Sequence, residues 1–131
     1  MSIAAELADF LAAQGVGERG GDEEWSIHVG EEPASPGSVI TLYDTGGPGD
    51  LNIDAEIAQP TVQVRVRASD YEACYDKHQQ IAAELVTELQ RMIGGHWYIG
   101  IWKTSDVLDI GRDSNKRCRM TANYRTLRQP P

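Results

Sequence analysis

The chain has 131 residues, of which 40% are hydrophobic and 24% charged, and its formal net charge is −8. This length suits one domain with a substantial core, and no run of about 20 apolar residues could span a membrane. The acidity argues against nonspecific nucleic-acid binding, which requires clustered cations. Residues 1–9 hold two acids and no basic segment, so we expect no secretory signal. We therefore expect residues 1–131 to form a single domain.

The charges are distributed unevenly along the chain. Residues 1–60 hold twelve acids and one base, a net charge of −11, whereas residues 61–131 hold eleven bases and eight acids, a net charge of +3. One interpretation is a solvated acidic first half. The other is that the acidic half of one copy meets the basic half of the next, because complementary fields favour head-to-tail contacts.

The first part of the chain predicts one helix and two strands. Residues 2–14 place their apolar side chains on one face, and Ser2 is a good N-cap. Residues 25–29 alternate between apolar and polar side chains, which is typical of a strand. Two prolines and a glycine in 31–37 indicate a turn, and the β-branched run 38–43 predicts a second strand.

The composition changes between residues 44 and 60. This segment is rich in glycine, proline and aspartate, and a loop of this length is usually functional or disordered. It also carries Leu51, Ile53 and Ile57, which a flexible linker would not need. We interpret 44–60 as an extended arm that lies against its own sheet or against a neighbouring molecule.

The next segment predicts a strand followed directly by a long helix. Residues 61–67 alternate strictly, with valines on one face and Gln63 and two arginines on the other. Ser69 and Glu72 match a capping box. The apolar spacing then predicts an amphipathic helix of about six turns, and Gly94-Gly95 is expected to end it.

The remaining residues predict three strands. These are 96–102, 107–110 and the alternating run 116–127, with 111–115 as a hairpin loop. Gly100 is expected to mark a bulge or a close backbone approach. The predicted fold is α+β: a mostly antiparallel sheet of about six strands, with the long helix and the shorter N-terminal helix packed on one side.

No arrangement of residues predicts catalysis. The three histidines are scattered, no Cys or His pair has zinc spacing, and His78 is expected to be a hydrogen-bonded core residue. The glycine-rich 46–49 lacks the lysine of a phosphate loop, and Asp109 alternates with apolar residues, which disfavours a calcium loop. Cys74 and Cys118 are expected to be buried thiols, which suits an intracellular site of production. We predict no catalytic residue, no cofactor, no metal site and no enzymatic activity.

The arginines of the second half are the main candidate binding groups. They could lie on a solvated sheet face, form a patch between subunits, or contact passing DNA, and the last is ranked lowest because no aromatic residues are interleaved with them. The candidate subunit or partner interface consists of Arg65, Arg67, Arg117, Arg119, Arg125, Leu51, Ile53 and Ile57.

Several segments together resemble the tail-completion proteins of long-tailed bacteriophages, often labelled minor capsid or tail terminator proteins. They are the strand 61–67, the helix start at 70–75, and the closing segments 110–115 and 124–128. The strand and Gly-Pro loop at 39–48 add to the resemblance, which covers most of the chain.

The resemblance implies a structural role in the virion tail or in a defective prophage. Such proteins form an α+β sandwich and assemble as hexameric rings that cap the tail tube, end its polymerisation and offer a surface to the head. The expected partners are therefore other copies of the chain, the tube protein and the head completion or connector protein, with assembly in the bacterial cytoplasm. DNA could pass through the ring without sequence-specific binding. The alternatives are a head–tail connector or adaptor, or a small-ligand binding module or enzyme on a similar scaffold.

Overall fold

The computed structural model describes residues 2–47, 50–52, 57–86 and 90–129. Within these residues the chain forms two helices and ten strands, and four of the strands have only two or three residues. In chain order they are α1 (Ile3–Ala13), β1 (Glu18–Arg19), β2 (Ser26–Val29), β3 (Val39–Gly46), β4 (Asp50–Asn52), β5 (Ile57–Ala58), β6 (Thr61–Ala68), α2 (Tyr71–Leu85), β7 (Arg91–Ile93), β8 (His96–Lys103), β9 (Leu108–Arg112) and β10 (Cys118–Arg128).

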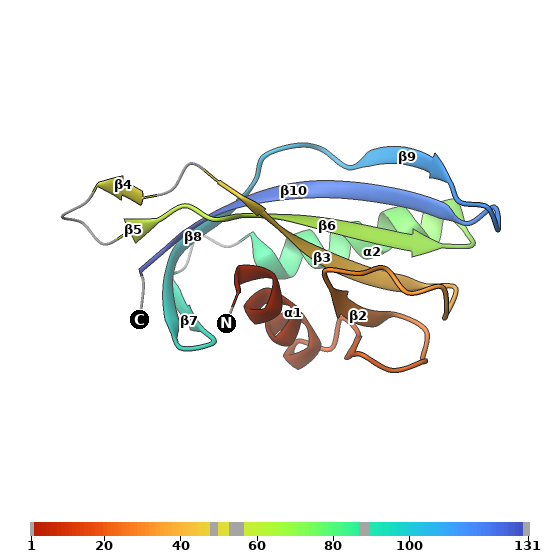
Figure 1. Ribbon diagram of the computed structural model, residues 1–131, viewed down its shortest axis with the longest axis horizontal. Helices are drawn as coiled ribbons and strands as arrows, with labels where there is room; N and C mark the ends of the chain where they lie inside the picture. Colours follow the sequence, from red (N-terminus) through yellow and green to blue (C-terminus); the bar gives the residue numbers. More distant parts are fainter. Residues whose placement is uncertain (1, 48–49, 53–56, 87–89, 130–131) are drawn as a thin grey trace.

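All ten strands belong to one sheet, whose main path is β1-β2-β3-β6-β10-β5-β4. Its centre, β3-β6-β10, is antiparallel, whereas β1-β2 and β2-β3 pair in parallel. The long strand β10 pairs β6 on one edge, and on its other edge it pairs first β9 and then β8. Both helices lie on the same side of this sheet (Figure 1). The predicted α+β class and the one-sided helices are confirmed, although the parallel pairs make the sheet mixed.

The alternation in β6 and β10 creates the core. Val64 is opposite Ala122 and Val62 is opposite Tyr124, and all four side chains are fully buried against the helices. Each buried valine contributes roughly 1.5–3 kcal/mol relative to an exposed one. The intervening residues of both strands point to the opposite side of the sheet, which we call the outer face.

The helix α1 forms as its sequence predicts. Ser2 caps it, and its hydroxyl accepts a hydrogen bond from the Ala5 amide at 3.2 Å. Its buried stripe includes Leu7 and Leu11, which pack on β2 and β3. Glu6 lies in the same stripe and is also buried.

The second helix is shorter than the six turns predicted from its apolar spacing. The cap is Asp70 rather than Ser69, and the helix ends at Leu85. Gly94 and Gly95 do not end a helix. They form the two-residue turn of the β7–β8 hairpin, where φ values of 60° and 86° suit a type I′ turn.

The β8 strand carries the bulge expected at Gly100. Leu127 pairs with Gly100 and Arg128 pairs with Tyr98, so Ile99 is an extra residue in the ladder. A Cβ at Gly100 would lie 2.6 Å from the Trp102 ring. The bulge lets both Tyr98 and Ile101 be buried although they are three residues apart.

The 44–60 segment is partly a strand pair. The β3 strand continues to Gly46, and β4 pairs antiparallel with β5, which contacts the end of β10. This pair lies at one end of the molecule (Figure 1). Leu51 and Ile57 belong to these strands, although only their backbones are described, and Ile53 lies outside the described residues. Whether these three residues bind a partner stays a prediction.

Candidate functional site

The outer face of the sheet holds all five candidate arginines. On β6 it carries Arg65 and Arg67, and on β10 and just before it, Arg117, Arg119 and Arg125. Arg119 is opposite Arg67, and Thr121 is opposite Arg65, so Arg65, Arg67 and Arg119 are neighbours across the two strands, whereas Arg125 lies further along β10, opposite Thr61. The sequence alternation therefore predicted this face correctly.

Two of these arginines hold a loop of the same chain. Arg67 is 2% exposed, donates to the Pro36 carbonyl at 2.7 Å, and forms an ion pair with Glu32 at 3.3 Å. Burial and the nearby Arg117 lower the pKa of Arg67, whereas Glu32 raises it. The Arg117 guanidinium pairs with Asp113 at 2.8 Å and also donates to a loop carbonyl. These two side chains therefore anchor residues 30–37 onto the sheet.

The other three, Arg65, Arg119 and Arg125, form what we call the arginine row. Within the described residues, no carboxylate pairs with any of them, and the Nε atoms of Arg65 and Arg119 are buried without a hydrogen-bond partner. Arg65 stacks on Tyr43 at 5.2 Å and Arg125 on Trp102 at 5.3 Å. In the part of the chain that the structure describes, the row therefore presents three cations without a paired carboxylate, next to two aromatic rings.

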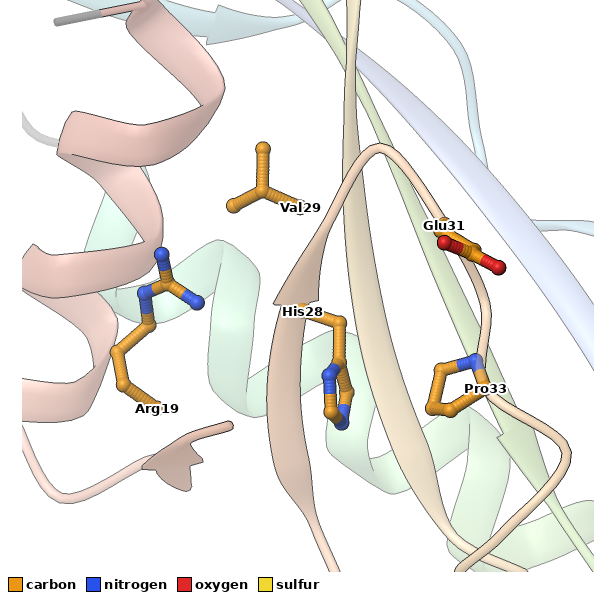
Figure 2. Close-up of a pocket in the computed structure, with 5 residues that line it drawn as sticks. All are labelled: Arg19, His28, Val29, Glu31 and Pro33. Atoms are coloured by element: carbon orange, nitrogen blue, oxygen red, sulfur yellow. The ribbon is translucent and has the colours of Figure 1, made fainter. Parts of the chain in front are cut away.

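A cleft of about 430 Å³ lies beside β2, lined by Arg19, His28, Val29, Glu31 and Pro33. Figure 2 shows Arg19 on one side of His28 and Pro33 on the other, with the Glu31 carboxylate pointing away from the ring. Arg19 already pairs with Asp9 at 2.9 Å and donates to the Ile27 carbonyl. The guanidinium of this cleft, that of Arg19, therefore already has partners within the chain.

A serine and a histidine meet in this region without forming a catalytic pair. The Ser26 hydroxyl lies 2.8 Å from His28 Nε2. Ser26 is fully buried and could not reach a substrate, and no carboxylate of the described residues hydrogen-bonds His28 Nδ1. Burial and the nearby Arg19 lower the pKa of His28. This pair stabilises the strand rather than activating a nucleophile.

Glu6 is a fully buried, multiply bonded carboxylate that sequence reasoning missed. It accepts from Tyr98 at 2.7 Å, forms an ion pair with Arg128, and is bonded to His96. These partners join α1 to β8 and to the end of β10, and the end of β10 lies beside β8 (Figure 1). The sequence did contain a signal for this cluster, because Glu6 lies within the apolar stripe of a predicted helix, where a charged side chain needs partners. All of its partners are accounted for, so we assign the cluster to stability.

The other titratable core groups are also structural. His78 is fully buried and hydrogen-bonded to the Met120 carbonyl at 2.8 Å, as predicted, and burial lowers its pKa to about 4. Cys74 and Cys118 are buried free thiols, also as predicted, and burial raises the pKa of Cys74 to about 12. In the described part of the chain, no group of three His, Cys, Asp or Glu side chains could hold a metal ion.

Comparison with known families identifies the chain. Residues 10–129 match the model of a family described as bacteriophage tail terminator protein. The chain belongs to this tail terminator family. The resemblance seen in the sequence is thereby confirmed, and membership implies a structural component of the virion tail. A search of curated proteins finds no match for this terminator family member. None of its helices, within the described residues, is long and apolar enough to cross a membrane.

Proposed function

We propose that this chain forms a hexameric ring on the end of the tail tube, where it ends tube polymerisation and joins the tail to the head. In this role the chain is not an enzyme. It assembles with copies of itself, with the tube protein and with a head completion or connector protein in the cytoplasm of the bacterial host. The family match over residues 10–129 is the observation that carries the proposal.

The geometry supports an assembly role. The arginine row is a cationic surface on a chain whose net charge is −8, and arginine forms bidentate pairs with carboxylates of a partner. The β4–β5 pair adds a second projecting surface at one end of the sheet. Acidic surfaces elsewhere on the ring would let DNA pass without binding, because phosphates are repelled by carboxylates.

Tube assembly in vitro tests the proposal. Purified tube protein is polymerised with and without this chain, and tube lengths and ends are recorded by electron microscopy. A terminator shortens the tubes, stops their elongation and adds a cap at one end, because it covers the surface to which the next tube subunit would bind. Tubes that elongate at the same rate with uncapped ends would contradict the proposal. Binding to heads with no binding to tube ends would indicate the connector role instead.

A further inference from the structure

The structure points to the surface that meets the arginine row: we infer that it is the exposed face of α2 in a second copy of this chain. We call this surface the acid–tyrosine face and define it as Tyr71, Glu72, Tyr75 and Asp76. The inference rests on the proposed ring and names the two surfaces through which neighbouring copies meet.

The acid–tyrosine face is exposed and carries the opposite charge to the row. All four residues lie on the solvent side of the first turns of α2, and Tyr71 and Tyr75 are 45% and 39% exposed. Within the described residues, neither Glu72 nor Asp76 takes part in an ion pair. Exposed tyrosines beside carboxylates are well suited to guanidinium groups, which can stack on the rings and pair with the acids.

The spacings of the two surfaces agree. Arg65 and Arg119 are diagonal neighbours across β6 and β10, so the two residues are roughly 7–8 Å apart and their Cβ atoms somewhat closer. Glu72 and Asp76 are four residues apart on a helix, which places their Cβ atoms about 6 Å apart. Arg119 and Arg125 are separated by about 20 Å along the strand, and the 15 residues of α2 span about 22 Å. A helix laid along the row would therefore match its length, with the acid–tyrosine face, about 8 Å long, opposite Arg65 and Arg119 and a later turn of α2 opposite Arg125.

The two surfaces lie on opposite sides of the same strands. The buried side of α2 is fixed beneath β6 and β10, where Cys74 Sγ donates to the Val66 carbonyl at 3.2 Å and His78 bonds Met120. The arginines of the row alternate with the buried residues of these strands and therefore point to the opposite side of the sheet. A contact between the row of one copy and the acid–tyrosine face of the next is therefore heterologous, and repeating it produces a ring when the rotation closes.

Charge reversal on each surface tests the inference. The row variant carries Arg65→Glu and Arg119→Glu, and the helix variant carries Glu72→Lys and Asp76→Lys. Each variant alone should self-associate at least about 100-fold more weakly than the wild type, because like charges then face one another. An equal mixture should recover association, since the reversed row meets the reversed helix and the native row meets the native helix. Sedimentation velocity measures each case.

Matched controls change the same number of charges elsewhere. Arg112→Glu with Lys116→Glu reverses two exposed cations of the β9–β10 hairpin, and Asp22→Lys with Glu23→Lys reverses two exposed acids of a loop. Both controls should associate like the wild type. Thermal unfolding identifies variants that fail to fold, in which case the milder Arg119→Gln and Asp76→Asn replace them, each with an expected weakening of about 10-fold.

The outcomes separate the inference from the proposed function. Variants that associate normally, or a mixture that fails to recover, overturn the inference, whereas tube capping in the same samples still reports on the proposed function. A row variant that self-associates but no longer binds tube ends would show that the arginine row binds the tube protein. That result would also overturn the inference. The inference is also contradicted if the wild-type chain is monomeric both in solution at about 1 mM and when it is bound to tube ends.

Discussion

Glu6 is a carboxylate with no exposed side-chain surface, and its three partners come from strands late in the chain. Replacing it with alanine leaves Arg128 without its counter-charge and Tyr98 without its acceptor. We expect Glu6→Ala to lower the free energy of unfolding by about 3–5 kcal/mol, which urea denaturation measures. The control is Asp9→Ala on the same helix. Its ion pair is with Arg19, the Asp9 side chain is 52% exposed, and the expected loss is under about 1 kcal/mol. Equal losses of unfolding free energy in Glu6→Ala and Asp9→Ala would contradict the stabilising role of the Glu6 cluster.

His78 couples stability to pH. Burial lowers its pKa from 6.5 to about 4, chiefly by desolvation, with a further lowering from Lys103 and an opposing effect of the Met120 carbonyl. The unfolded chain therefore binds more protons than the folded one between these values, so stability is full above pH 6.5 and falls as the pH drops toward 4. The titration of His78 alone should lower the free energy of unfolding by about 3 kcal/mol over that pH range.

The His78→Gln variant isolates this contribution, because the glutamine amide can still donate to the Met120 carbonyl but does not titrate. The difference between the unfolding free energies of wild type and variant should shrink by about 3 kcal/mol between pH 7 and pH 4. Chemical denaturation at a series of pH values measures it. A difference that is independent of pH would show that His78 does not titrate in this range.

At the scale of single elements, the β7–β8 turn links backbone geometry to the Glu6 cluster. Gly94 has φ of 60°, and a Cβ there would lie 2.7 Å from Glu6 Oε2, whereas Gly95 has φ of 86° and open space around it. Alanine at either position incurs roughly 1–2 kcal/mol of left-handed backbone strain. Gly94→Ala should lose at least about 1 kcal/mol more than Gly95→Ala, because the hydrogen bonds of Glu6 prevent it from moving aside. Equal losses in denaturation experiments would show that the carboxylate can adapt.

The same hairpin explains which elements the sequence could predict. Strict alternation in β6 and capping at Ser2 are local signals, and both elements form where expected. The helix α2 was predicted to reach Met92 because apolar residues in this stretch fit a helical period. A short strand fits them equally well, and pairing of Met92 with Trp97 across a turn with two positive φ values selects the strand. This pairing is local, since the two residues are five apart, and Gly94-Gly95 between two apolar runs is itself a hairpin signal that competes with the helix-stop interpretation.

At the scale of the whole molecule, the sequence located the arginines on one face but did not predict how they divide. Arg67 and Arg117 bind the carbonyls of Pro36 and Ala34, and those bonds depend on how a distant loop folds over the sheet. The split into an acidic and a basic half also changes in three dimensions, because Glu72 and Asp76 of the basic half lie across the sheet from the arginines. The exposed acids of α2 and the arginines of β6 and β10 therefore lie on opposite sides of the sheet, although they belong to the same half of the chain.

This arrangement predicts how self-association depends on salt. Copies with a net charge of −8 repel one another, but above about 0.1 M salt the screening length is roughly 10 Å, so repulsion between distant charges is already weak. Raising NaCl from about 0.1 to about 1 M then acts mainly on the close pairs between the arginine row and the acid–tyrosine face. We expect the wild-type association constant to fall by about 10-fold over this range. Sedimentation velocity at each concentration provides the measurement, with the Asp22→Lys and Glu23→Lys control included because it changes net charge without changing the contact. Association that strengthens with salt in both proteins would show that apolar burial, rather than these charges, holds the copies together.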